Sequence, residues 1–261
     1  MTLVRHELKQ GLASFCIWTA SIGALLAVCI FLFPEMKPEM DGLSDMFSSM
    51  GAFTAAFGMD KLGFGTLIGF YAIECGNILG LGGAFYAALC GVGALSKEEA
   101  TGTAEFLFAH PVSRARVLTE KLTAAFLEIT AMNLLLFALS IGSIATTGED
   151  IPWKELALLH CAYYLLQLEI ASVCFGISAF LRKGAAGAGL GIATILYFFN
   201  LIANIAEPAA FLRYITPFSY CDGSYIVANG HLHGAFAVAG ATIGLAGIAV
   251  AYLKYCGKDL R

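Results

Sequence analysis

The chain has 261 residues, of which 59% are hydrophobic and only 13% are charged, and its formal net charge is −4. A soluble domain carries about 25% charged residues, so this composition, with a mean hydropathy of +0.78, excludes an ordinary soluble protein. The small negative charge also gives no electrostatic basis for binding nucleic acid.

Six apolar stretches are long enough to cross the hydrocarbon core of a bilayer, which takes about 20 helical residues. Backbone groups in lipid must be bonded internally, and the alternation of a barrel strand is missing, so all six are predicted to be helices. The expected fold is an all-α integral membrane protein with a single transmembrane domain covering 1–261. The predicted spans are 14–34, 66–95, 122–146, 155–181, 185–206 and 234–254.

The first span follows a short basic start and has no small-residue cleavage site, so it is predicted to be retained. Residues 2–12 are expected to form an amphipathic helix at the inner membrane surface. With the N-terminus inside, eleven of the 15 lysines and arginines fall in cytoplasmic segments, which predicts that both termini face the cytoplasm. These eleven are Arg5, Lys9, Lys97, Arg114, Arg116, Lys121, Arg182, Lys183, Lys254, Lys258 and Arg261.

Two longer segments are expected on the outer side. Residues 35–65 combine helix-forming apolar spacing with glycine breaks and are predicted to lie along the outer surface. Residues 207–233 are aromatic, interrupted by proline and too polar to cross the membrane. This composition suits an interfacial belt or a short re-entrant hairpin. The aromatic residues concerned are Tyr214, Phe218, Tyr220 and Tyr225.

The longest polar segment, residues 96–122, follows the second span on the inner side. A helix here places acidic and aromatic groups such as Glu105 and Phe106 side by side. Pro111 is expected to end that helix, and Ser113 is expected to cap the next one. Such a face fits a partner cleft lined by cations and apolar groups; the alternative is a solvated amphipathic linker. Acidic residues are disfavoured beside an anionic inner leaflet, which favours the protein partner.

Polar side chains inside the spans are candidates for a translocation path, because burying them in lipid is costly. The candidates are Glu74, Asn77, Glu169, Asn200 and Asn204. The alternative is that they join helices through hydrogen bonds, each contributing about 0.6–2 kcal/mol. For the asparagines the structural role is favoured. For Glu169, near the middle of the bilayer, both interpretations stay open, and its carboxyl group is expected to be protonated or paired.

Glycine pairs at GxxxG spacing predict close packing between helices. They are Gly65/Gly69, Gly76/Gly80, Gly187/Gly191 and Gly240/Gly244. The eight cysteines are scattered singly, without a CxxC motif or a Cys/His cluster. Neither a disulfide, a metal site nor a catalytic site is therefore expected on this chain.

Residues 98–121 contain Glu98-Glu99, Gly102-Thr103, Glu105-Phe106-Leu107, Pro111-Val112-Ser113-Arg114 and Lys121. This pattern resembles the signature of ABC-2 type transporter permeases, with Ala104 and Phe108 where leucine is usual. The likeness extends to the start of the chain, which is similar to the family's cytoplasmic elbow helix. It also includes TPFSY at 216–220, which is similar to an outer loop, and the ending GKDLR at 257–261.

The resemblance implies a permease subunit of an ABC transporter, acting as an exporter. In that family the segment after the second span is the coupling helix, which docks on separate ATPase subunits. The implied coupling residues are Glu98, Glu99, Gly102, Thr103, Glu105, Phe106, Pro111 and Arg114.

Several further expectations follow from the resemblance. A second permease subunit, identical or related, is implied, and ATP and magnesium are expected on the partner ATPase. The residues agree, because the chain contains no GxxxxGK[ST] phosphate loop. The protein is expected to be a multi-pass protein surrounded by lipid in a cell membrane, the bacterial plasma membrane. Its apolar spans favour a hydrophobic or amphipathic cargo.

Two other functional classes compete with a transporter. A sensory or structural membrane subunit would dock the same ATPase without moving a cargo, and transport into vesicles would separate the two. An intramembrane enzyme is disfavoured, because the spans hold no rhomboid-type Gly-x-Ser-Gly with a partner histidine and the chain has no HExxH motif.

Overall fold

The structure, a computed structural model, describes residues 2–57, 59, 62–63, 65–101, 113–181 and 185–257. All regular elements within these ranges are helices. Six of the described helical segments are long and apolar enough to cross a membrane, which confirms the predicted all-α membrane architecture. They are Leu3–Glu39, Leu67–Lys97, Arg114–Thr147, Trp153–Ser178, Ala185–Ile205 and Gly234–Cys256.

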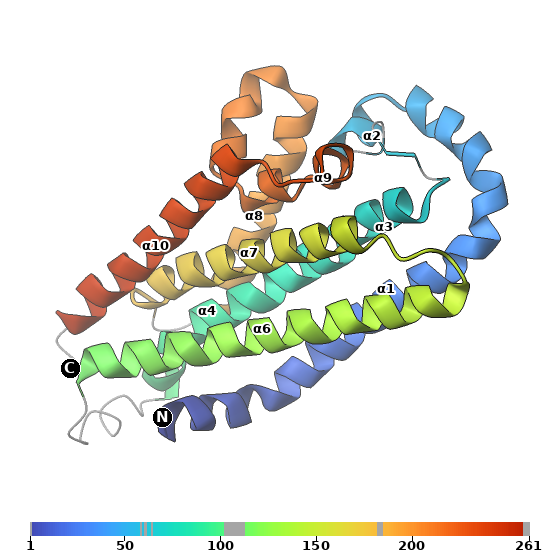
Figure 1. The fold of residues 1–261 in the computed structure, drawn as a ribbon. Coiled ribbons are helices and arrows are strands. Elements are labelled where there is room, and N and C mark those ends of the chain that lie inside the picture. The colour runs from blue at the N-terminus through green and yellow to red at the C-terminus, as the bar shows by residue number, and fades with distance from the viewer. Residues whose placement is uncertain are drawn as a thin grey trace.

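The first span belongs to one long helix, α1 (Thr2–Ser49). Residues 2–12 are helical as predicted, but they continue directly into the span instead of forming a separate helix. The first turns run at an angle to the remainder of α1 (Figure 1). Near the end of this span α1 contains Pro34 and Pro38, and proline bends a helix because it lacks an amide hydrogen. The segment predicted to lie outside therefore begins as a bent extension of α1 and continues in the short helix α2 (Ala52–Ala56). We call the end of the bundle that holds this segment the outer end, and the opposite end the inner end, after the orientation that the sequence predicts.

The second span changes its helical geometry in the middle. It consists of α3 (Leu67–Cys75), the π-helical segment η1 (Gly76–Leu81) and α4 (Gly82–Thr101). A π-helical turn within a longer helix is rare and occurs frequently at functional sites. Here the wider turn lies against Tyr163 of α7, which leaves no room for a side chain on either of two glycines. A Cβ added to Gly76 would lie 2.9 Å from the Tyr163 hydroxyl, and a Cβ added to Gly80 would lie 3.0 Å from the Tyr163 ring.

The other spans are α6 (Arg114–Thr147), α7 (Trp153–Ser178), α8 (Ala185–Ile205) and α10 (Gly234–Cys256). Helix α7 lies at the centre, between α4 and α10, and α1 packs along α6 (Figure 1). The second span and α7 are the most buried, whereas few residues of α8 and α10 are buried. The exposed faces are apolar, as expected for helices that meet lipid.

The second outer segment folds into three short helices: η2 (Glu207–Tyr214), η3 (Pro217–Cys221) and α9 (Gly223–Asn229). The predicted interfacial belt holds only in part. Tyr214 is 57% exposed, but Phe218 and Tyr220 are buried, because η3 packs against α7, α8 and α10. These two aromatic side chains help to close the outer end of the bundle.

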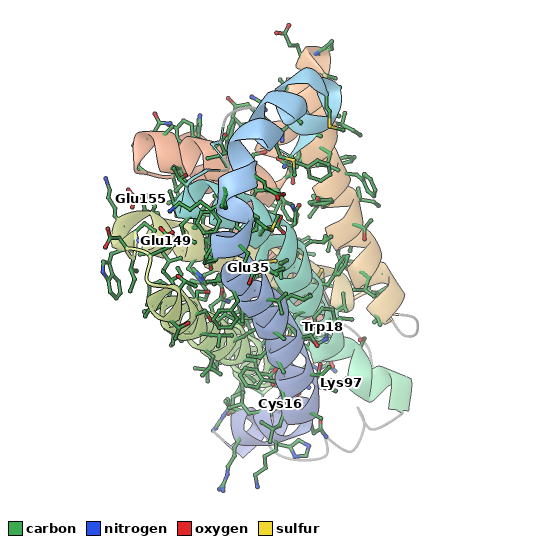
Figure 2. The ribbon with its side chains drawn as sticks, turned by 90° about the vertical axis from the view of Figure 1, so that its right-hand side faces the viewer. Cys16, Trp18, Glu35, Lys97, Glu149 and Glu155 are labelled. Atoms are coloured by element: carbon green, nitrogen blue, oxygen red, sulfur yellow. The ribbon has the colours of Figure 1, made fainter. Side chains whose placement is uncertain are left out.

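The two ends of the bundle differ in charge. The N-terminal end of α1 and the C-terminal end of α10 lie at the same end, as an even number of crossings requires (Figure 1). Figure 2 shows Lys97 near that end and Glu35, Glu149 and Glu155 towards the other. At the outer end Lys37 of α1 pairs with Glu149 at 2.6 Å, which ties α1 to the turn after α6.

Candidate functional site

Most of the predicted coupling residues lie outside the described residues. This holds for Gly102, Thr103, Glu105, Phe106 and Pro111, and for the side chains of Glu98 and Glu99, whose backbone continues α4. Arg114 is described: it begins α6 and donates a hydrogen bond to the Tyr255 carbonyl, 3.2 Å away in the last turn of α10. Ser113 caps α6 by accepting a hydrogen bond from the Arg116 amide at 3.3 Å, as predicted.

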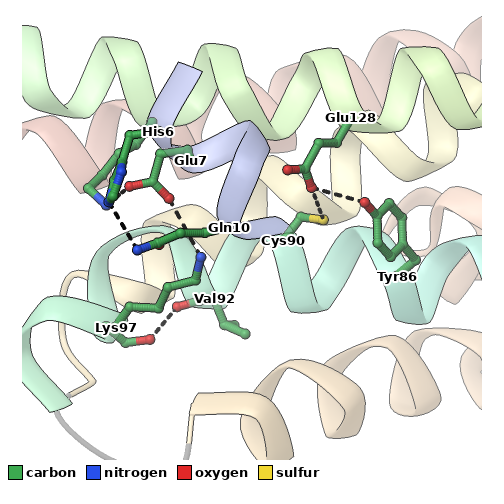
Figure 3. A network of polar contacts seen from close by, with 10 residues as sticks. His6, Glu7, Gln10, Tyr86, Cys90, Val92, Lys97 and Glu128 are labelled. Atoms are coloured by element: carbon green, nitrogen blue, oxygen red, sulfur yellow. Dashed lines mark hydrogen bonds and ion pairs between the residues drawn. The ribbon is translucent and has the colours of Figure 1, made fainter. Parts of the chain in front are cut away.

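A carboxylate of α1 connects the two helices that border this segment. Glu7 is only 7% exposed, and its oxygens lie 2.7 Å from Lys121 Nζ and 3.5 Å from Lys97 Nζ. Lys97 is in the last turns of α4 and Lys121 is in the first turns of α6. We call Glu7, Lys97 and Lys121 the Glu7 clamp, and its Glu7–Lys97 contact is visible in Figure 3.

A second acid fastens the start of α1 to α6. Glu120 accepts hydrogen bonds from the backbone amides of Leu3 at 3.2 Å and Val4 at 3.4 Å. The first amides of a helix have no partner within it, and a carboxylate there also interacts favourably with the helix dipole. Arg116 holds the same carboxylate in place at 3.0 Å. The N-terminal turns of α1 are thus attached to α6 at two separate points.

Deeper in the bundle, a cavity of about 200 Å³ separates α1, α4 and α6. Glu128 lies on its wall and accepts hydrogen bonds from the Tyr86 hydroxyl at 2.9 Å and from Cys90 Sγ at 3.7 Å (Figure 3). Helix α1 passes so close that a Cβ added to Gly11 would collide with the Glu128 carboxylate. All three helices therefore meet at polar groups on the inner side.

Three of the predicted path residues meet in a smaller cavity, of about 70 Å³, at the outer side. Asn77 reaches it from η1, while Asn200 and Asn204 reach it from α8. Asn77 Oδ1 accepts a hydrogen bond from the Tyr197 hydroxyl at 3.3 Å, and Asn204 Nδ2 donates one to the Ala56 backbone carbonyl at 3.1 Å. These three side chains are uncharged, and they come from two separate helices, η1 and α8.

The two acidic candidates lie elsewhere. Glu74 faces α1, where Cys29 Sγ is 3.9 Å from its carboxylate. Glu169 accepts a hydrogen bond from the Tyr220 hydroxyl at 2.9 Å, so it is paired, and it lies against Gly240 of α10. Burial raises the pKa of Tyr220 well above its usual range, and the Glu169 carboxylate raises it further. Tyr220 therefore stays protonated and able to donate.

Glu7 and Glu120 were not identified from the sequence. One signal was present for Glu7: it is a lone acid in a basic segment, and it shares a helical face with Gly11 and Ser14, which line the same cavity. Glu120 lies in a helix start rich in charges, where no pattern distinguishes a capping acid from a solvated one. The two helix amides that it caps, those of Leu3 and Val4, are more than a hundred residues away in the sequence.

The comparisons with known proteins agree with this geometry. A family model described as "ABC-2 family transporter protein" matches residues 1–250. The matched region includes the Glu7 clamp, both cavities and all of the first five spans. A search of curated proteins gives no match.

Proposed function

Because this chain belongs to the ABC-2 family transporter proteins, we propose that it exports a hydrophobic or amphipathic cargo, driven by separate ATPase subunits. Family membership makes it a multi-pass membrane protein and the permease component of an ABC transporter. The outward direction, the ATPase contact and the pairing with a second permease subunit are the proposed parts. Magnesium and ATP belong to the ATPase partner in this proposal.

The coupling step begins at residues 96–110, which are proposed to bind the ATPase subunits. Force applied there enters the second span through the end of α4 and the third span through the start of α6. The single observation that carries this step is that Glu7 binds Lys97 and Lys121 together. Through Glu7 the push also reaches α1, and through Arg114 it reaches the end of α10.

The outer cavity is proposed as the outward part of the path. Its asparagines form only neutral hydrogen bonds, and such bonds between spans contribute little free energy, about 0.6 kcal/mol on average. A tilt of the second span against α8 can therefore separate Asn77 from Tyr197 at small cost. An apolar cargo leaving along this route would meet one carboxylate, Asp222, which already accepts hydrogen bonds from the Ser224 and Tyr225 amides.

Charge reversal tests the ATPase contact. Glu98→Lys, Glu99→Lys and Glu105→Lys are expected to lose the copurifying ATPase and its stimulated hydrolysis, while membrane insertion stays normal. Glu35→Lys is the matched control, because Glu35 is an exposed acid at the opposite end of the bundle. Unchanged copurification and stimulation in all three variants would show that the ATPase binds elsewhere.

A second experiment tests the clamp. Lys97→Met removes its more exposed cation, whose side chain is 48% accessible, and is expected to keep ATP hydrolysis while lowering transport. Transport is measured by mass spectrometry of the lumen of inside-out vesicles supplied with ATP or ADP. Wild-type vesicles that stimulate hydrolysis but accumulate nothing would favour the non-transporting sensory subunit instead.

A further inference from the structure

A third cavity, of about 230 Å³, opens between the middle of α6 and the outer half of α7, and we call it the α6–α7 groove. It lies apart from both the Glu7 clamp and the outer cavity. Leu134 on its edge is 65% exposed, so the groove opens on an apolar face of the bundle. Its lining consists of Thr130, Asn133, Leu134, Phe137, Ala157, His160, Cys161 and Tyr164.

Asn133 contributes a buried acceptor that has no donor. The residue is 6% exposed, and its amide nitrogen donates to the Ile129 carbonyl at 2.8 Å and to Gln167 at 2.7 Å. A backbone carbonyl can only accept, so the contact with Ile129 determines which way the amide points. Within the described part of the chain, Asn133 Oδ1 has no hydrogen-bond partner. It needs a group that donates.

His160 contributes a second unmatched atom. It is 5% exposed, and its Nε2 lies 2.7 Å from the Tyr71 hydroxyl, which also bonds to Ser140 at 2.8 Å. Phe137 packs edge-on against the imidazole at 5.0 Å, which places His160 beside the α6 wall. Its Nδ1 is buried and has no hydrogen-bond partner among the described residues. This nitrogen donates or accepts according to the direction of the Tyr71 hydroxyl.

Buried polar atoms are costly to leave unpaired, above all where no water can reach them. A hydroxyl group meets both requirements, because it can donate its one hydrogen to Asn133 Oδ1 while its oxygen accepts from His160 Nδ1–H, the tautomer in which Nε2 accepts from Tyr71. Among the residues that the structure describes, the lining carries no lysine, arginine or carboxylate, so it offers no counter-charge for an ionic head group. An apolar cavity of about 150 Å³ can hold benzene, and this groove is larger.

We propose that the α6–α7 groove binds one neutral alcohol dissolved in the lipid, consisting of an apolar chain or ring with a hydroxyl group. The chain lies against Leu134 and Phe137, and the hydroxyl bonds to Asn133 and His160. This binding does not depend on the ATPase. It can therefore be tested on the full chain alone, and its failure would leave the transport proposal untouched.

The test uses the full chain reconstituted in lipid nanodiscs and a long-chain alcohol that carries a photoreactive diazirine. We expect saturable labelling of α6 and α7 peptides that line the groove. Unlabelled alcohol of the same length should compete, and the matching alkane should compete about thirtyfold less well, the difference that two hydrogen bonds make. Equal competition by the alkane would overturn the proposal.

Ala157→Phe fills the groove from its exposed side, so it should abolish the saturable labelling without disturbing the core. Ala138→Phe is the matched control, since Ala138 is an exposed alanine of α6 outside the groove. Asn133→Leu should retain the groove but reduce the preference for alcohol over alkane to about fivefold, because only the bond to His160 remains. Labelling that is equal in Ala157→Phe and wild type would show that the probe binds elsewhere.

A second copy of the chain covering this face is the competing occupant. Cys161 is exposed and lines the groove, so mild oxidation would then join two copies through it. We expect mild oxidation to give no dimer linked through Cys161. Efficient formation of a disulfide-linked dimer in the wild type, and its loss in Cys161→Ser, would overturn the proposal.

Discussion

The inner and outer ends of the bundle are held together by different chemistry. At the inner end, the buried pair Glu7–Lys121 joins α1 to α6, and the longer contact of Glu7 with the half-exposed Lys97 adds α4. At the outer end, the contacts are neutral hydrogen bonds of Asn77 and Asn204 beside a cavity. Removing one partner of a buried ion pair costs about 3–5 kcal/mol, several times the contribution of one hydrogen bond between spans.

The difference has a mechanical consequence under the proposed coupling, in which an ATPase pushes on the inner end. Helices joined by buried charges move together, so a push at the inner end is transmitted through α1, α4 and α6 instead of being absorbed there. Neutral contacts at the other end separate at lower cost. The bundle is therefore expected to open on the outer side first.

The largest effect is expected from Lys121→Met. This change leaves Glu7 buried with only the longer contact to Lys97, and should lower the free energy of unfolding by about 3–5 kcal/mol. Denaturant-induced unfolding in mixed micelles measures it. A loss below about 1 kcal/mol, the range of an exposed pair, would show that the clamp contributes no more than a surface contact.

A smaller effect is expected between the two ends, at Tyr220 and Glu169. Tyr220→Phe leaves the buried Glu169 carboxyl without its donor and should cost about 1–3 kcal/mol. Glu169→Gln keeps an oxygen that accepts from Tyr220, so this variant should assemble normally and change transport only. A Glu169→Gln protein that fails to fold would support a purely structural role for this residue.

The outer cavity should be the weakest point. Asn204→Leu removes the hydrogen bond to the Ala56 carbonyl and is expected to cost about 0.6 kcal/mol, measured by the same unfolding experiment. Asn200→Leu, at a neighbouring position on the cavity wall, is the matched comparison. If Asn204→Leu destabilised the protein as much as Lys121→Met, the contrast between the two ends would be lost.

A last substitution, Lys37→Met, tests whether the inner end is more stable because its ion pair is buried or simply because it is charged. The outer end also has an ion pair, Lys37–Glu149, but the Lys37 side chain is 45% accessible. Lys37→Met is therefore expected to cost about 0–1 kcal/mol and to lose most of that effect in high salt. A cost equal to that of Lys121→Met would mean that burial is not the deciding factor.

Glycine spacing illustrates how far a local pattern reaches. Gly76 and Gly80 were predicted to pack closely, and they do, against Tyr163. Gly187 and Gly191 have the same spacing, yet an added Cβ on either would meet no atom of the described residues within 4 Å. The spacing shows that one face of a helix lacks bulky side chains. Whether another helix packs against that face depends on how the helices are arranged.

The sequence by itself determined the class of the protein, the six spans, the cap at Ser113 and the family resemblance. These properties follow from local composition, because an apolar run in lipid must satisfy its own backbone groups and therefore becomes a helix. Only the tertiary structure decided that Glu7 meets Lys121, 114 residues away, and that Asn77 and Asn200 share one cavity. Such meetings depend on the rotation and tilt of each helix, which arise from packing among all the spans and leave no periodic trace in any one of them.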